Sequence, residues 1–405
     1  MPDKLAFNKF LPFVLLYFFF NSVFLPFGLL YTMLLSPLFI FWMYRHKHPM
    51  YFGFFGCISL TWAAIHYANG IHIFYYARSY VLLVSAYIFC LVCYRFIQHT
   101  KQIDTIFKHV LILNGYFVLF AIITYPILFI RTTLWSFIPI SRGLENIPRL
   151  QLWTYEPSYY SLLMAPLVIY FALKILLYPI KKWFLTVVFI TIPLLLSFSF
   201  GIIGALGLSF ALMLLIHART FIRYKRIVWA VGSILILSIS SFALLQLLIP
   251  DNPLVKRIIN VSKGLDTSAK GRTTGAFMIG SDIAEMRSKW FGVGLGQTKL
   301  LAPKLPYYKD YNEETLRIPN TIAELLAVYG LLGVFLKLFL EIWLFFRTKV
   351  FKNYYRLSLF IFMFIYQFTG SFVLNIAELS IWVLAFSPAA FTLFDKNKFQ
   401  PIPKT

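Results

Sequence analysis

Residues 320–346 read NTIAELLAVYGLLGVFLKLFLEIWLFF, a run with only three charged side chains. A helix that crosses the hydrocarbon core of a membrane needs about 20 mostly apolar residues. Glu324 lies one turn inside the first end of the run. Lys337 and Glu341 lie toward the second end, where long charged side chains can extend back to the headgroups. The stretch therefore predicts a membrane-spanning helix.

The rest of the chain has the same character. Of its 405 residues, 60% are hydrophobic and only 13% are charged, whereas a soluble domain has about 25% charged residues. This composition excludes a disordered chain, a coiled coil and an ordinary soluble enzyme. Further apolar runs lie near residues 10–23, 25–44, 50–68, 73–95, 107–130, 158–179, 183–199, 201–217, 227–249, 357–373 and 377–394. We predict an all-α, polytopic transmembrane bundle of about twelve spans.

The Lys and Arg residues alternate between connections as the positive-inside rule requires. Twenty of them fall in the termini and the even-numbered connections, and the short odd-numbered connections carry none. Both termini are therefore predicted to be cytoplasmic, and the first run to be an uncleaved anchor because it lacks a small-residue cleavage site. The formal net charge of +22 is then mostly an insertion signal, with no reason to expect a nucleic-acid partner.

Two outer connections are too long to be simple turns, residues 131–157 and 250–319. Loops of such length usually carry function or are disordered. Together they hold 14 Lys and Arg against nine Asp and Glu, an excess that topology does not require. We predict a single integral-membrane domain over residues 1–405 with these two extracytoplasmic loops, the second of them folded, and an anionic substrate beside them.

The first loop contains SRGLENIPRLQLWTYEPSYYS (141–161), with Arg142, Arg149 and Glu156. An arginine fork binds phosphate oxygens bidentately. The carboxylate, seven residues after Arg149, can act as a base or orient an arginine. The alternative is an Arg–Glu pair that only holds the loop together.

The second loop contains GRTTGAFMIGSDIAEMRSKWFGVGLGQ (271–297). We expect Arg272 to open an amphipathic helix that ends near Trp290. The glycines of FGVGLG (291–296) permit tight turns and close backbone approach. They do not form a dinucleotide-binding fingerprint, because no strand precedes them and no βαβ unit surrounds them.

Polar residues at the outer ends of the predicted spans are further candidates. Asn320 stands where it can cap the helix that follows. Glu324, Glu378 and Arg78 are charged residues within spans, and such residues mark a site by default because burying charge in a membrane is costly. Arg78 can alternatively extend to the surface.

Other chemistries find no support in the sequence. Cys57, Cys90 and Cys93 lie in apolar runs, which indicates packing and not a disulfide framework. The histidines form no HExxH motif, and the acidic residues within 310–314 lack EF-hand spacing. No P-loop and no GxSxG elbow is present. We therefore predict neither a metal nor another cofactor.

The ordered motifs resemble the O-antigen polymerase and ligase family (Wzy-like proteins). They are an Arg seven residues before Glu-Pro, then Gly-Arg, then Trp with FGVGLG, then Asn with AELLAVYGLLG, over about residues 140–335. The resemblance implies a GT-C-like glycosyltransferase of the bacterial inner membrane, with its active site on the outer face. Such polymerases transfer a glycan from undecaprenyl pyrophosphate to a sugar hydroxyl of another lipid-linked repeat unit, as in lipopolysaccharide biosynthesis.

The resemblance also assigns roles to residues. The family's extracytoplasmic arginines hold the pyrophosphate, which by match are Arg149 and Arg272, with Arg142 a weaker match. Glu156 is our candidate for the base that accepts the hydroxyl proton. The predicted substrate-binding residues are Arg142, Arg78, Asn320 and Glu324. The implied partners are the lipid-linked glycan, membrane lipid and a chain-length regulator.

Two alternatives stay open at this stage. The first, within the same superfamily, is an O-antigen ligase or a peptidoglycan-type polymerase. Ligases commonly have a His beside the Asn, but here Pro319 and Thr321 flank Asn320. The second is a flippase of lipid-linked oligosaccharides. Transporters usually show repeats, broken helices and midplane charges, whereas this chain concentrates its polar residues in the outer loops. Both comparisons favour a polymerase.

Overall fold

The fold is known from a computed structural model of the chain. It describes residues 12–25, 29–48, 50–100, 102–138, 147–178, 182–222, 240, 246–248, 253–305, 318–389 and 391–398. Within these residues nearly all regular structure is helical, and the one sheet is a pair of two-residue strands. The prediction of a helical fold is confirmed.

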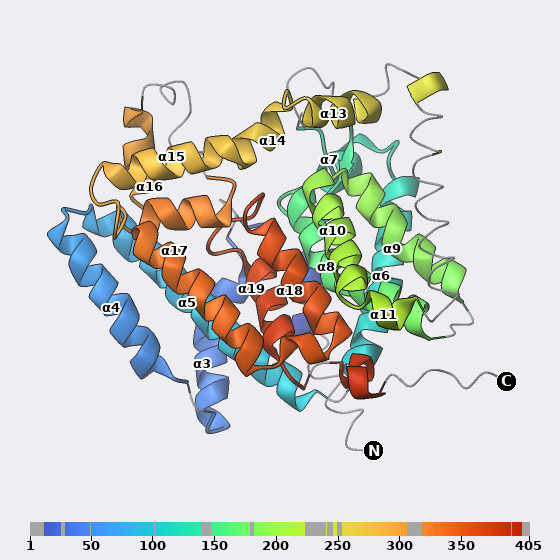
Figure 1. Cartoon of the computed structure of the whole chain (residues 1–405), viewed down its shortest axis with the longest axis horizontal. Helices are drawn as coiled ribbons and strands as arrows, with labels where there is room; N and C mark the ends of the chain where they lie inside the picture. Colours follow the sequence, from blue (N-terminus) through green and yellow to red (C-terminus); the bar gives the residue numbers. More distant parts are fainter. Residues whose placement is uncertain are drawn as a thin grey trace.

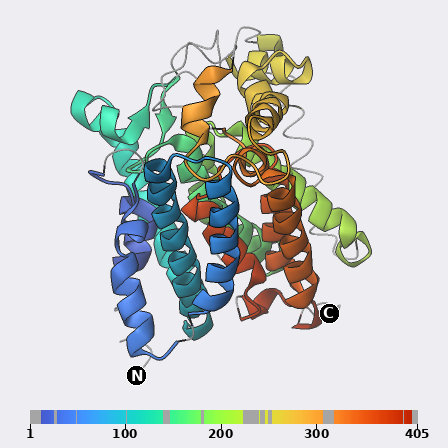
Figure 2. The ribbon, with the colours of Figure 1, turned by 90° about the vertical axis from the view of Figure 1, so that its left-hand side faces the viewer.

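Several helices have the length and composition of membrane spans. Within the part of the chain that the structure describes, four are long and apolar enough to cross a membrane: α5 (Ile73–His99), α6 (Ile103–Ile123), α8 (Pro157–Leu177) and α17 (Thr321–Arg347). Shorter apolar helices accompany them: α4 (Phe52–Ala68), α9 (Trp183–Ser197), α10 (Phe200–Ile216), α18 (Tyr354–Tyr366) and α19 (Ile376–Phe386). Figure 2 shows several of them running side by side. The chain is therefore built as a membrane-embedded bundle, and the count of about twelve spans stays a prediction.

The remaining elements are short. They are η1 (Leu16–Phe20), α2 (Tyr31–Leu34), α3 (Ser36–Arg45), α7 (Leu128–Leu134), β1 (Trp135–Ser136), β2 (Arg149–Leu150), α11 (Ala218–Phe221), α13 (Pro253–Ser262), α14 (Thr267–Arg272), α15 (Thr274–Glu285), α16 (Thr298–Leu301), η3 (Ala302–Lys304), η6 (Val350–Lys352), η7 (Thr392–Phe394) and η8 (Lys396–Lys398).

Some predicted spans have different bounds in the structure. The run at 25–44 forms only the short helices α2 and α3, and the run at 227–249 lies almost entirely outside the described residues. The run at 107–130 divides after Ile123, where Pro126 follows and cannot donate a helical hydrogen bond. Helix α19 ends at Phe386, because the next residue precedes Pro388 and is held in an extended conformation.

The predicted span over 320–346 corresponds to α17, but the helix is not continuous, because it is broken at Gly330 (φ 68°, ψ −168°). The break frees carbonyls before it and N–H groups after it, and residues 289–294 satisfy four of these groups. The bonds run from Val293 N to Ala327 O (2.9 Å), Gly294 N to Val328 O (3.0 Å), Leu331 N to Lys289 O (3.0 Å) and Leu332 N to Trp290 O (3.1 Å). The FGVGLG segment therefore closes a helix break.

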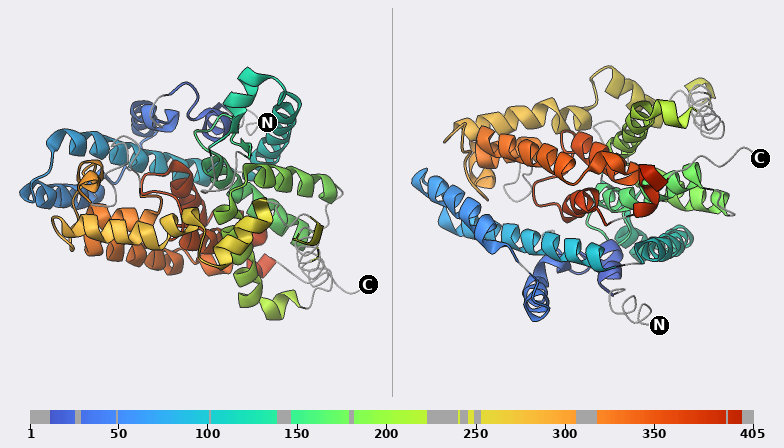
Figure 3. Two further views of the ribbon diagram at one scale, coloured as in Figure 1. Left: turned by 90° about the horizontal axis from the view of Figure 1, so that it is seen from above. Right: turned by 60° about the horizontal axis from the view of Figure 1, so that its bottom comes forward.

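The described parts of both predicted outer loops lie at one end of the bundle. Figure 1 shows α13, α14 and α15 along this end, with α7 close by. From above, α15 runs along the first part of α17 (Figure 3). Gly280 makes this packing close, because a Cβ at this position would stand 2.4 Å from the Ala323 carbonyl oxygen. The loops that carry the candidate arginines are thus packed directly on the helices.

Candidate functional site

Arg149 is placed at this end of the bundle by the β1–β2 pair. Leu150, the next residue of the strand, is fully buried, and successive strand side chains point to opposite faces. The guanidinium of Arg149 donates through Nε to the carbonyl of Ser197 at 3.1 Å. The side chain is thereby directed toward the turn between α9 and α10.

The charges around Arg149 identify its neighbours. Its pKa is lowered to about 10, mainly because burial removes water from the guanidinium, and further because the positive charges of Arg272 and Arg257 lie nearby. The carboxylate of Glu156 acts in the opposite direction. Arg149 therefore stays protonated at neutral pH. Arg149 thus lies near enough to both Glu156 and Arg272 for their charges to interact with its guanidinium, so the three predicted residues lie close together.

Arg272 occupies a different helix position from the predicted one. It is the last residue of α14, and Thr273 (φ −110°, ψ −102°) separates it from α15, which ends at Glu285 and does not reach Trp290. Asp266, which no sequence motif indicated, starts α14, because its side chain accepts from the Ala269 N–H at 2.7 Å. Arg272 therefore closes a short helix at the site, where we had expected it to open a long one.

Glu156 is the N-cap residue of α8. Pro157 holds it in an extended conformation (φ −159°, ψ 153°), and its carboxylate accepts from the Ser158 hydroxyl at 2.5 Å. Glu156 and Arg272 both lie near enough to Tyr366, at the end of α18, for their charges to interact with its hydroxyl. A carboxylate held beside arginines can accept a proton from a hydroxyl or orient a guanidinium.

Arg257 is a member of the cluster that sequence reasoning missed. It lies on α13, pairs through Nε with Asp266 at 3.3 Å and stands 4.7 Å from the centroid of the Phe200 ring. Burial lowers its pKa, and the charge of Asp266 acts in the opposite direction. No motif pointed to it, because Arg257 was one of several basic residues in the second loop. The cluster thus contains three arginines.

Asn320 connects the cluster to α17. Its side-chain oxygen accepts from the Ala323 N–H at 2.9 Å, so the predicted helix cap is confirmed. Its amide nitrogen donates to the carbonyls of Arg272 at 2.9 Å and Phe368 at 2.5 Å. The residue is fully buried. These contacts make Asn320 a residue that positions Arg272, and its predicted contact with substrate stays a prediction.

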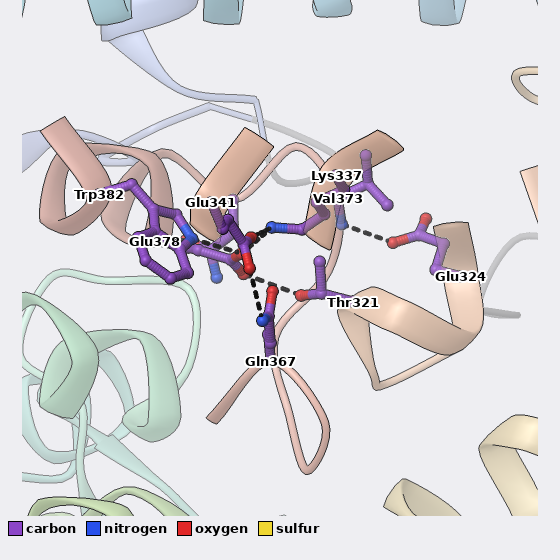
Figure 4. Close-up of polar contacts among 9 residues, drawn as sticks. Thr321, Glu324, Lys337, Glu341, Gln367, Val373, Glu378 and Trp382 are labelled. Atoms are coloured by element: carbon purple, nitrogen blue, oxygen red, sulfur yellow. Dashed lines mark hydrogen bonds and ion pairs between the residues drawn. The ribbon is translucent and has the colours of Figure 1, made fainter. Parts of the chain in front are cut away.

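The carboxylates near Asn320 accept hydrogen bonds from other parts of the protein (Figure 4). Glu324 lies on the short first part of α17 and accepts from the Val373 N–H at 2.7 Å. Glu378 accepts from the Thr321 hydroxyl at 2.8 Å. The structure thus gives Glu324 and Glu378 roles in holding the start of α17, and a contact of Glu324 with substrate stays a prediction.

The prediction that Lys337 and Glu341 extend to the cytoplasmic surface is wrong. Lys337 pairs with Glu341 and lies 3.7 Å from Glu378 of α19, and Glu341 is only 5% exposed. The break at Gly330 explains the error, because Lys337 is about two turns from the start of the continuous part of α17. Both side chains therefore form ion pairs inside the bundle.

The other predicted residues stand apart from the cluster. Arg78 is exposed on α5, and no contact within the described ranges joins it to the three arginines. Arg142 lies outside the described residues, as do the acidic residues within 310–314. The three cysteines are free. The described residues contain no group of three or more His, Cys, Asp or Glu that could hold a metal ion.

No protein-family model matches the chain, and no curated protein is similar to it. The functional assignment therefore depends on the residues and their geometry.

Asn320 offers a direct test of how the cluster is positioned. Asn320→Ala should destabilise the fold by more than about 2 kcal/mol, because it removes the cap and leaves the buried carbonyls of Arg272 and Phe368 without their donor. It should also reduce the glycosyl transfer that the sequence predicts about tenfold. Asn320→Ser keeps an oxygen for the cap but has no amide to donate to the Arg272 carbonyl, so part of the stability should recover while the transfer stays low. Thermal unfolding and product formation measured on the same preparations separate the two roles. Full transfer in Asn320→Ser would contradict the positioning role.

Proposed function

We propose that the chain is a membrane glycosyltransferase that joins lipid-linked oligosaccharide repeat units into O-antigen or a related surface polysaccharide. One observation carries this proposal. Arg149 and Glu156 from one loop, and Arg272 from another more than 100 residues later, gather at the end of an apolar helical bundle. A cationic site at the headgroup level of a membrane suits a substrate with an anionic diphosphate and a hydrocarbon tail.

The proposed reaction uses each residue differently. The acceptor sugar hydroxyl attacks the anomeric carbon of the donor glycan, and the bond from this carbon to the undecaprenyl pyrophosphate oxygen breaks. Glu156 accepts the hydroxyl proton. Arg149 and Arg272 stabilise the negative charge that develops on the leaving pyrophosphate. Asn320 holds the segment that carries Arg272.

The setting of the site is part of the same proposal. A GT-C-like architecture in the bacterial inner membrane, with both termini in the cytoplasm, would place the arginine cluster on the outer face, where lipid-linked repeat units are used. The basic connections at the predicted cytoplasmic ends support this orientation. A chain-length regulator is the proposed protein partner.

Deletion of the gene distinguishes this function from its alternatives. Loss of a polymerase should leave lipid core that bears a single repeat unit. Loss of a ligase leaves bare core, and loss of a flippase traps repeat units on the cytoplasmic side. The products can be separated by gel electrophoresis of the extracted glycolipids. Unchanged long chains in a strain without a second polymerase would refute the proposal.

A further inference from the structure

The turn between α9 and α10 lies against two of the three arginines. Arg149 donates to the carbonyl of Ser197, the last residue of α9, at 3.1 Å. The guanidinium of Arg257 lies 4.7 Å from the ring centroid of Phe200, the first residue of α10. Ser199 stands between them as the N-cap. The N-terminus of a helix of 17 residues is thus brought to the arginine cluster.

Two buried polar groups at this turn have no partner among the described residues. Ser199 is 5% exposed, and its hydroxyl makes no hydrogen bond, not even the cap bond typical of this position. The Nη1 atom of Arg257 is buried without an acceptor. Buried polar groups are nearly always hydrogen-bonded. These two therefore mark a place that suits an anionic ligand.

The groups around this place are mostly donors. The first N–H groups of α10 have no intrahelical acceptor, and they carry the positive end of the helix dipole. Asp266 is the acidic neighbour, and it is already committed, because it caps α14 and pairs with Nε of Arg257. The pair fixes the Arg257 guanidinium above Phe200 and leaves its buried Nη1 for another acceptor.

We propose that Ser199, the first N–H groups of α10 and Arg257 form a second phosphate subsite beside Arg149 and Arg272, so that the site binds a lipid-linked diphosphate through both of its phosphates. The inference rests on the proposed function, since it divides the same anionic group between two sets of donors. A helix N-terminus binds phosphate oxygens through its free N–H groups, and a guanidinium adds charge-assisted bonds. One phosphate would contact Arg149 and Arg272, and the other would contact the α10 N-terminus.

Affinities for prenyl mono- and diphosphates test this division. We would measure the binding of farnesyl diphosphate, farnesyl monophosphate and inorganic pyrophosphate to the full-length protein in detergent. The wild type should bind the diphosphate at least about tenfold more tightly than the monophosphate. Ser199→Ala should weaken diphosphate binding about fivefold, and Arg257→Gln about 10- to 100-fold, with monophosphate binding changed less than about threefold.

Ser209→Ala is the matched control. Ser209 is a fully buried serine of the same helix, and its hydroxyl already donates to the Leu206 carbonyl at 2.9 Å. The substitution should leave the ratio of the two affinities unchanged. Monophosphate binding is the internal check that Arg257→Gln has kept its fold.

The outcomes separate this inference from the proposed function. An unchanged ratio in both Ser199→Ala and Arg257→Gln would overturn the second subsite alone, provided that the wild type binds the diphosphate. A wild type that binds none of the three ligands would overturn both proposals. Farnesyl diphosphate bound more tightly than pyrophosphate would identify the lipid headgroup as the source of the ligand. Equal binding would instead indicate recognition of the free diphosphate, with the two subsites retained.

Discussion

Replacing Arg149 or Arg272 by alanine should reduce polymer formation at least about 100-fold, while the protein still inserts into the membrane. In the proposed reaction each guanidinium faces charge that grows as the pyrophosphate leaves, and a partly buried site has little water to replace it, so the effect should be large. Chain length and amount of the product, measured in a deletion strain that carries each variant, check the prediction. Membrane insertion is followed by immunoblot of washed membranes.

Lysine variants test the geometry of the contact. Arg149→Lys and Arg272→Lys keep the charge but lose the planar fork, so they should restore only a small part of the activity. Arg131→Ala is a suitable control, because Arg131 lies in α7 at the same end of the bundle and contacts the rings of Tyr125 and Phe137. Full activity in both alanine variants would refute the assignment of the pyrophosphate site.

The sequence predicted the helices well where apolar residues continue without interruption. Helices α5, α8, α9 and α10 coincide closely with predicted runs. Their positions follow from the local sequence, because each is a continuous apolar segment. The break at Gly330 was not predictable in this way. A single glycine in an apolar run is normally tolerated inside a helix, and the groups freed by the break are satisfied by residues 289–294, far away in sequence.

In the candidate site, too, some residues could be predicted from the local sequence and others could not. The nomination of Arg149, Glu156 and Arg272 came from their residue types and from a family resemblance, and the structure brings them together. Arg257 was not nominated, because its place depends on a non-local contact with Phe200 and on a short helix whose N-cap, Asp266, was overlooked. Sequence spacing identifies chemistry, whereas contacts between distant segments decide which residues share a site.

Gly330→Ala should destabilise the folded protein by more than about 3 kcal/mol. The position has a φ of 68° and a ψ of −168°, a conformation that essentially only glycine adopts and that costs another residue about 1–3 kcal/mol. A Cβ would also lie 2.4 Å from the Trp290 carbonyl oxygen, which belongs to backbone that closes the helix break. Thermal unfolding in detergent should show a large decrease in the melting temperature. Activity should fall as well, because Asn320, the N-cap of α17, holds Arg272.

Three other glycines separate the causes of this effect. Gly264 has a φ of 68° and open space around it, so Gly264→Ala should cost only the backbone strain, about 1–2 kcal/mol. Gly280 has no such φ, but its Cβ would lie 2.4 Å from the Ala323 oxygen, so Gly280→Ala should show the steric cost, about 1–3 kcal/mol. Gly207, inside α10 with nothing within 4 Å, should become slightly more stable as alanine. If Gly330→Ala were no worse than Gly264→Ala, the close packing of FGVGLG against the break would not stabilise the fold. The motif would then have to be explained by a contact with substrate.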